Sequence, residues 1–185
     1  MQTARNDEQH YTYIDYCSWD DGERWELIDG VAYAMSPGAS FAHQSVCVEL
    51  LTQLSNYLQD KPCKVFTAPF DVRLNAKADD DTVVQPDILV VSDPSKFDPK
   101  GIVGAPDLII EVLSPSTEKR DRNTKFKLYQ RFGVHEYWIV DPSNETVSIN
   151  SLKSGKYITH LHFKEDTVPV NVLDGCTIDL TRVFV

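Results

Sequence analysis

The stretch LIIEVL, residues 108–113, constrains the fold of this chain most, because an acidic side chain interrupts a run of branched aliphatic residues. Such a run is typical of a strand that is buried on both faces of a sheet. A carboxylate buried without a partner is strongly destabilised and takes up a proton instead. The sequence therefore predicts that a partner or a bound cation lies close to Glu111.

The length and composition of the chain predict a single globular domain. Its 185 residues are enough to bury a sizeable core, so we expect one domain over 1–185, with a disordered tail at 1–10. The longest apolar runs are too short to span a bilayer, and no membrane partner is expected. The first ten residues lack the apolar core of a secretory signal. Four scattered cysteines favour reduced thiols in a cytoplasmic protein.

The charge of the chain is unevenly distributed. The net charge of −10 argues against a general nucleic-acid coat protein, because phosphate binding needs a positive surface. Segment 118–131, however, contains six basic and two acidic residues and so carries +4, against −14 for the remainder. This segment is either a solvated helix face or a local patch that faces phosphate.

The hydrophobic spacing predicts an α+β or α/β fold with a mixed or mostly antiparallel sheet. Two helices are expected, one over 41–60 and one over the basic segment up to a C-cap at Gly133. Seven to nine strands are expected. They lie within 23–35 (a hairpin turning at Asp29-Gly30), 64–74, 83–91, 107–113, 135–140, 146–163 (a second hairpin) and 175–185.

Two Pro-Asp pairs flank the apolar strands, and their spacing separates their roles. Asp107 lies four residues before Glu111, about 13 Å along one strand, and is too distant to share a small cation with it. Asp87 begins the other apolar strand, so neighbouring strands would bring Asp87 and Glu111 to one end of the sheet. Two such carboxylates repel unless a cation lies between them, and oxygen ligands suit Mg²⁺ or Mn²⁺. A plain salt bridge from Glu111 to a lysine or arginine is the alternative.

The basic helix supplies a candidate partner. At 100° per residue, Lys125 shares the apolar face of this helix with Asp121 and Tyr129. The opposite, solvated side is predicted to carry Lys127, Arg131 and Arg120. A lysine on a core-facing stripe needs an acidic partner, and Glu111 is within reach.

Asp87, Glu111 and Lys125 together form a cluster suited to phosphodiester hydrolysis. The two carboxylates would hold a divalent cation that activates water and stabilises charge on the phosphate. The lysine would orient the water or stabilise the phosphate oxygens.

The segments around these residues resemble the Uma2 (DUF820) family, restriction-endonuclease-like proteins of the PD-(D/E)XK superfamily. The matching segments, from Trp25 to Phe184, are WELIDG, MSPGASFAHQSV, QPDILVV, GAPDLIIEVLSPSTEKRDRNTKFKLYQRFGVHEYWIVDP and IDLTRVF.

The resemblance implies one nuclease-like domain with a central four- or five-stranded mixed sheet flanked by helices, and with additional N-terminal and C-terminal β-hairpins. It assigns Asp87 and Glu111 to the motif acids and the carbonyl of Val112 to a further Mg²⁺ or Mn²⁺ ligand. An E-x-K motif would place lysine at Leu113, and Lys125 fits variants in which that lysine has moved to the following helix. DNA would be the substrate, and a homodimer would suit cleavage of both strands.

The sequence allows two roles for each of several other residues. Glu26 is either on a solvated strand face or a third acid beside the metal, as its match to the family pattern implies. His43 either belongs to the site or caps and packs its helix, and Tyr129 either bonds the site or packs. Ser114 and Ser116 are expected to start the helix and not to act as nucleophiles. His160 and His162 are not expected to form a zinc site.

Two other functions compete with a metal-dependent endonuclease. A nuclease-fold protein that binds nucleic acid or a protein partner without cutting is favoured by Leu113 and by the net charge of −10. A carboxylate-pair glycosidase is disfavoured by the inward-facing Lys125 and by the lack of an aromatic groove.

Overall fold

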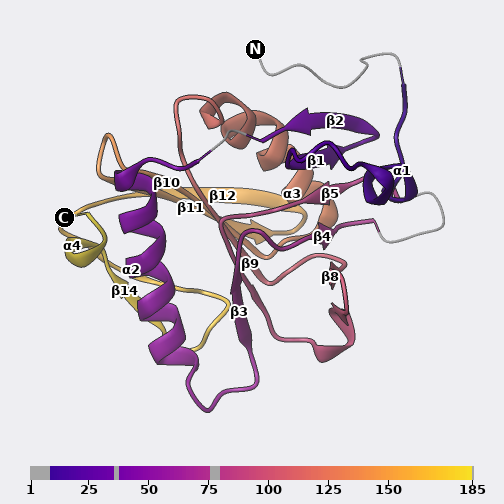
Figure 1. Ribbon diagram of the computed structural model, residues 1–185. Coiled ribbons are helices and arrows are strands. Elements are labelled where there is room, and N and C mark those ends of the chain that lie inside the picture. The colour runs from indigo at the N-terminus through magenta and orange to yellow at the C-terminus, as the bar shows by residue number, and fades with distance from the viewer. Residues whose placement is uncertain (1–8, 36–37, 76–79, 185) are drawn as a thin grey trace.

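A computed structural model describes residues 9–35, 38–75 and 80–184 (Figure 1). The helical elements are α1 (Tyr13–Ser18), α2 (Phe41–Leu58), η1 (Pro94–Lys96), η2 (Arg120–Lys125), α3 (Phe126–Phe132) and α4 (Leu180–Val183). The strands are β1 (Trp25–Ile28), β2 (Val31–Ala34), β3 (Lys64–Thr67), β4 (Val72–Arg73), β5 (Val83–Val84), β6 (Ile88–Val91), β7 (Phe97–Asp98), β8 (Gly101–Val103), β9 (Leu108–Val112), β10 (Glu136–Asp141), β11 (Thr146–Lys153), β12 (Lys156–Phe163), β13 (Thr167–Pro169) and β14 (Thr177–Asp179).

A mixed sheet in the order β12-β11-β10-β9-β6-β3 forms the centre of the molecule. Its strands pair antiparallel except for β9 and β10, which run parallel because the helical segment η2–α3 connects them. The expected mixed sheet is confirmed. It has six strands, because the hairpin β11–β12 extends it beyond the four or five that the resemblance implied.

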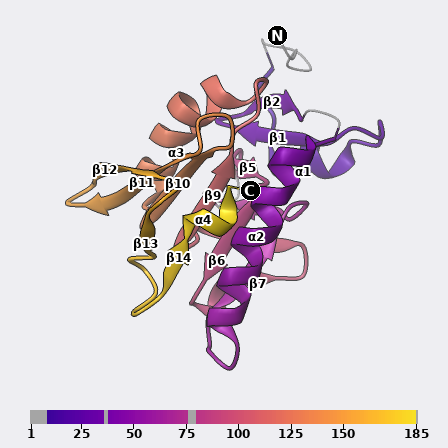
Figure 2. The ribbon, with the colours of Figure 1, turned by 90° about the vertical axis from the view of Figure 1, so that its left-hand side faces the viewer.

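Both faces of the central sheet are covered. Helices α2 and α4 lie on one face, and α3 lies on the other with the N-terminal sheet β2-β1-β5-β4-β8-β7 (Figures 1 and 2). Alternate residues of β9 therefore pack into different cores: Leu108 and Ile110 toward α2, and Ile109 toward α3. Glu111 falls on the α3 side, where it meets the basic helix.

Most of the predicted elements are confirmed. The first hairpin turns at Asp29 and Gly30, whose φ angles of 49° and 76° suit the two-residue turn, and Gly133 ends α3 with a φ of 80°. The short strands β7 and β8 were missed, because two or three residues are too few for a hydrophobic period to mark them. Strands β4 and β5 lie within the expected ranges 64–74 and 83–91, but they belong to the N-terminal sheet, whereas β3 and β6 from the same ranges belong to the central sheet. Helix α1 was also missed, because no residue of it is buried.

The first half of the basic helix departs from regular α-helical winding. Residues Arg120–Lys125 form a π-helical segment, in which residues five apart share a face. The expectation that Arg120 lies on the solvated side is therefore wrong, because that expectation assumed α-helical winding. The side chain of Arg120 is 13% exposed and faces Glu26, as Lys125 does.

Two further expectations concern the ends and the environment of the chain. Residues 1–8 of the expected disordered tail lie outside the described residues, and the Nε2 atom of His10 is 3.2 Å from Oδ2 of Asp81. No helix within the described ranges has the length and apolar character needed to cross a bilayer.

Gly101 provides a test of how the N-terminal sheet is held together. A Cβ atom at Gly101 would overlap the carbonyl oxygen of Asp71, which accepts a hydrogen bond from the backbone N–H of Ile102. Gly104 also has a positive φ, but a Cβ there meets open space. Both Gly→Ala changes carry backbone strain of about 1–3 kcal/mol. We expect Gly101→Ala to lower the free energy of unfolding by at least about 1 kcal/mol more, because of overpacking. Equal urea midpoints for the two variants would contradict this.

Candidate active site

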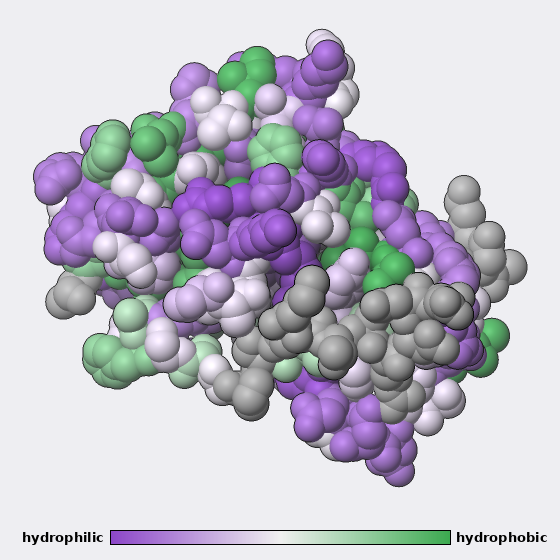
Figure 3. Space-filling view, turned by 90° about the horizontal axis from the view of Figure 1, so that it is seen from above, coloured by the Kyte–Doolittle hydropathy of each residue, from purple (hydrophilic) through white to green (hydrophobic). Residues whose placement is uncertain are grey.

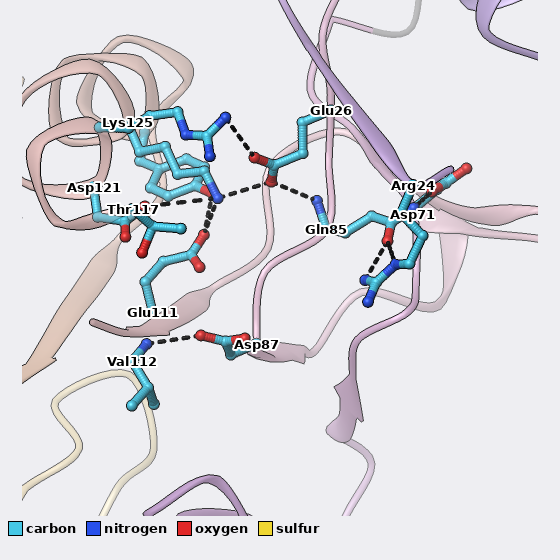
Figure 4. A network of polar contacts seen from close by, with 12 residues as sticks. Arg24, Glu26, Asp71, Gln85, Asp87, Glu111, Val112, Thr117, Asp121 and Lys125 are labelled. Atoms are coloured by element: carbon cyan, nitrogen blue, oxygen red, sulfur yellow. Dashed lines mark hydrogen bonds and ion pairs between the residues drawn. The ribbon is translucent and has the colours of Figure 1, made fainter. Parts of the chain in front are cut away.

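The two predicted acids meet at one end of the central sheet. Strands β6 and β9 pair antiparallel with Ile88 opposite Ile110, so the residues one step further, Asp87 and Glu111, lie opposite each other. The carboxylate oxygen Oδ2 of Asp87 accepts a hydrogen bond of 2.8 Å from the backbone N–H of Val112. This bond lies beyond the last paired residues of the two strands, Ile88 and Ile110, and it fixes Asp87 beside the end of β9 (Figure 4).

The partner of Glu111 is Lys125, as predicted. The Nζ atom of Lys125 lies 2.8 Å from Oε1 of Glu111, 2.7 Å from Oε1 of Glu26 and 3.8 Å from Oδ1 of Asp121. All four side chains are at least 94% buried. Figure 4 shows the ammonium between Glu26 and Glu111, with Asp87 on the far side of Glu111. One buried cation thus joins strand β1, strand β9 and helix η2.

Tyr129 makes a second bond to Glu111. Its hydroxyl donates to Oε1 of Glu111 at 2.8 Å, so of the two roles left open for this residue, hydrogen bonding to the site is the observed one. Lys125 and Tyr129 both donate to Oε1. Among the described residues, the other oxygen of Glu111, Oε2, receives no hydrogen bond.

Glu26 belongs to this cluster and not to a solvated strand face, since it is 1% exposed. Its Oε1 atom also accepts a hydrogen bond of 3.1 Å from the backbone N–H of Gln85, and its Oε2 atom is 4.0 Å from Arg120. Along β1, Glu26 faces away from Trp25 and Leu27, which pack in a separate apolar cluster. The helix that covers this face of β1 could not be identified from the strand itself.

Asp87 has a second neighbour in His43, in the first turn of α2. The Nε2 atom of His43 is 3.2 Å from Oδ2 of Asp87, and the backbone N–H of His43 is capped by the hydroxyl of Ser40. Burial disfavours the charged imidazole. The hydrogen bond and charge of Asp87 outweigh burial, with a smaller effect from the Val112 carbonyl, and raise the pKa of His43. Of the two roles considered for His43, a place in the site or the capping and packing of its helix, the structure shows the first.

The cluster has more negative than positive charge. Four carboxylates, of Glu26, Asp87, Glu111 and Asp121, face two permanent cations, Lys125 and Arg120. Burial raises the pKa of Glu111 well above its usual range, Lys125 opposes this shift, and Asp121 and Asp87 add to it. Burial also raises the pKa of Asp121. Burial opposes the charge of Lys125, but Glu111 and Glu26 outweigh it and raise its pKa.

The excess negative charge lines a cavity of about 550 Å³. Its polar lining comes from the ends of β6 and β9, from β1, from the start of α2 and from the turn that leads into η2. The lining includes Glu26, His43, Asp87, Glu111, Ser114, Thr117, Arg120, Asp121 and Lys125. Figure 3 shows hydrophilic side chains across the middle of the face that carries η2–α3 and the β1–β2 hairpin. The cavity is large enough for a phosphate group with a bound cation.

The donors at Asp87 fit a divalent cation. A carboxylate oxygen of Asp87, the free Oε2 of Glu111 and the Val112 carbonyl are oxygen ligands of the kind that Mg²⁺ and Mn²⁺ take. The cluster has four carboxylates and two permanent cations, which is an independent reason why a cation would be stabilised there.

Other predicted residues lie elsewhere. Asp107 caps the end of β6 by accepting from the N–H and hydroxyl of Ser92, consistent with its expected place at a strand start. Leu113 is 8% exposed and packs in the core beside α3. The carbonyl of Ser114 accepts hydrogen bonds from the backbone N–H groups of Thr117 and Glu118, where the helical turn begins.

Sequence reasoning missed one part of the network. The side-chain amide of Gln85 donates to Asp71 at 2.9 Å, and its oxygen accepts from Arg24 at 2.6 Å (Figure 4). Gln85 thereby ties the loop before Asp87 to the N-terminal sheet. Its position two residues before Asp87, in QPD, was the available signal.

Comparison with known proteins gives the same picture of the fold. The sequence profile of Uma2, described as "Putative restriction endonuclease", matches residues 11–181. The uncharacterized proteins slr1290 and sll1609 of Synechocystis sp. are 33% identical over 117 residues and 31% identical over 122 residues. These alignments cover 62% and 64% of this chain, and 60% and 67% of the two relatives, so the chain matches about three fifths of the first one.

A solved structure shows the same fold. The crystal structure of a "putative nuclease belonging to DUF820" from Anabaena variabilis superposes with a TM-score of 0.75. The two chains are 18% identical, and the match covers 94% of this chain and 97% of the other.

Removing the charge of Lys125 tests the electrostatics of the cluster. We expect Lys125→Met to lower the free energy of unfolding by about 3–5 kcal/mol at neutral pH, because it leaves buried carboxylates uncompensated. Lys127→Met, two residues further on the exposed side of the helix, should change it by less than about 0.5 kcal/mol. Urea unfolding measures both.

The same variant should show a distinct dependence on pH. Acids whose folded-state pKa is raised, as for Glu111 and Asp121, stabilise the fold below their ordinary pKa and lose that contribution as the pH rises through the raised value. The deficit of Lys125→Met should therefore shrink as the pH falls toward about 4. A deficit that does not change with pH would show that lost packing, not charge, is its cause.

Proposed function

Because the chain belongs to the Uma2 family, we propose that it is a metal-dependent endonuclease that hydrolyses phosphodiester bonds in DNA. The observation that carries this proposal is the buried set of Glu26, Glu111 and Lys125 beside Asp87, in a polar cavity at the end of the sheet. A buried charge cluster is less stable than a well-packed apolar one, so its presence favours a role in chemistry.

The proposed cofactor is Mg²⁺ or Mn²⁺, with Asp87, Glu111 and the Val112 carbonyl as its ligands. A cation bound there would stabilise the negative charge that develops on the phosphate and lower the pKa of an attacking water. The protein holds these ligands in place by hydrogen bonds. The N–H of Val112 fixes Asp87, and Lys125 and Tyr129 fix Glu111 through its Oε1 atom.

Lys125 is the proposed catalytic lysine. An ammonium has three N–H donors, and its two short contacts, to Glu26 and Glu111, use two of them. The third N–H remains for a phosphate oxygen or for the attacking water, since Asp121 at 3.8 Å is beyond hydrogen-bonding distance. Glu26 acts by fixing the ammonium from the side opposite Glu111, which makes it a positioning residue.

Plasmid cleavage tests this function. We expect the protein with Mg²⁺ or Mn²⁺ to nick or linearise plasmid DNA, and Asp87→Ala to reduce the rate at least about 100-fold, because a cation ligand is lost. The matched control is Asp107→Ala, which removes the aspartate of the other Pro-Asp pair, outside the cavity. Identical products from wild type and Asp87→Ala would rule the nuclease out.

A second candidate is a protein of the same fold that binds nucleic acid or a protein partner without cutting. Leu113, buried where an E-x-K motif has lysine, favours it, as does the net charge of −10. This candidate predicts salt-sensitive binding to a labelled DNA duplex that survives Glu111→Gln, in the absence of cleavage. Loss of all binding in that variant would count against it.

A homodimer is proposed as the assembled state, because two sites related by a two-fold axis would cut both strands of a duplex. The hairpin β11–β12 is the proposed contact region. Its outer strand is an edge of the central sheet and exposes Ile158, Leu161 and Phe163 at 45%, 54% and 54%. A monomeric mass by sedimentation at micromolar concentration would contradict this.

A further inference from the structure

The imidazole of His43 lies where the proposed cation would bind. His43 is 9% exposed, and its ring points from the first turn of α2 toward the end of the central sheet. Its Nε2 atom is 3.2 Å from Oδ2 of Asp87. The ring therefore contacts one of the proposed cation ligands directly.

The distance between His43 and Asp87 suits two ligands of one metal ion. Metal–nitrogen and metal–oxygen bonds of about 2.0–2.2 Å, at angles between a right angle and the tetrahedral angle, place the two ligand atoms about 2.8–3.6 Å apart. The observed separation of 3.2 Å lies in this range. The nitrogen can thus donate a hydrogen bond to Asp87 when no cation is bound, and can coordinate a cation without a change of rotamer.

The other side of the ring is held by Cys47. The Sγ atom of Cys47 lies 3.6 Å from Nδ1 of His43, one helical turn further along α2. A ligand atom from each of His43, Cys47 and Asp87 lies within 4.8 Å of the other two. Burial, with the nearby charges of Asp87 and Glu111, raises the pKa of Cys47, so the sulfur stays a neutral thiol. An imidazole that coordinates a metal through one nitrogen is commonly fixed by a contact at the other.

We propose that His43 is a nitrogen ligand of the cation at Asp87, with Cys47 as its positioning residue, and that the site prefers Mn²⁺, Co²⁺ or Zn²⁺ over Mg²⁺. This inference rests on the cation site of the proposed function. Imidazole suits first-row transition metals, whereas Mg²⁺ prefers oxygen ligands and keeps its waters. An all-oxygen site would lack this preference, so His43 determines the metal specificity.

Metal titration of the protein tests the proposal. We expect wild type to bind Co²⁺, followed by its visible absorption, at least about tenfold more tightly than it binds Mg²⁺, followed by calorimetry. His43→Gln should weaken Co²⁺ binding at least about tenfold and leave Mg²⁺ binding nearly unchanged. Unchanged Co²⁺ affinity in His43→Gln, or equal affinities for the two metals in wild type, would overturn the proposal.

The matched control is His135→Gln. His135 also faces an aspartate, with its Nδ1 atom 3.6 Å from Oδ1 of Asp107, but this pair lies at the other end of β9. The His135→Gln variant should bind Co²⁺ as tightly as wild type does. Cys47→Ser should weaken Co²⁺ binding less than His43→Gln does, because Cys47 acts only through the ring, and a larger loss would overturn its positioning role.

A spectroscopic measurement on wild type avoids dependence on how the variants fold. Pulsed electron paramagnetic resonance of the Mn²⁺-loaded protein should show hyperfine coupling to a directly bound nitrogen, and its absence would overturn the proposal. The cleavage assay and the spectroscopic measurement test the nuclease function and the role of His43 independently. A protein with nitrogen coupling that leaves plasmid intact contradicts only the nuclease function. A protein that cuts DNA without nitrogen coupling contradicts only the role of His43.

Discussion

The ammonium of Lys125 is the interaction on which the rest of the site depends. It lies between carboxylates from strand β1, strand β9 and its own helix, which are far apart in sequence. A buried carboxylate repels its neighbours, so the hairpin and the end of β9 approach this closely only because a positive charge separates them. The same contact fixes the docking of the N-terminal sheet, the helix and the central sheet.

The cluster remains short of positive charge even with Lys125 and Arg120 in place. Protonation of Glu111 is one way to relieve this, as its raised pKa indicates, and a bound cation is another. These two ways compete for the same carboxylate. Under the proposed function, a cation bound there would relieve the remaining repulsion between the carboxylates. An ordinary buried salt bridge, in which the charges already balance, would gain nothing from such a cation.

The sequence predicted those parts of the site that depend on regular periodicity. The apolar run around Glu111 indicated a buried strand, and the wheel of the basic helix placed Lys125 toward it, because both rules assume standard geometry. The inward position of Arg120 was not predictable in this way, since π-helical winding leaves no hydrophobic period to read. The contact of His43 with Asp87 depends on how α2 crosses the sheet, which is a property of packing and not of local sequence.

The π-helical segment has a consequence for how chain length relates to the site. Glu111 and Lys125 are separated by 14 positions, and the wide turn between them takes up one more residue than an α-helix would. Deleting a single residue there would restore regular winding, in which residues four apart share a face, so the later side chains would keep their orientation toward the strand. The lysine would then still face both glutamates, although the segment had become one residue shorter. In this segment a one-residue gap between relatives is therefore compatible with an intact site, whereas the same gap in a regular helix would rotate the lysine away.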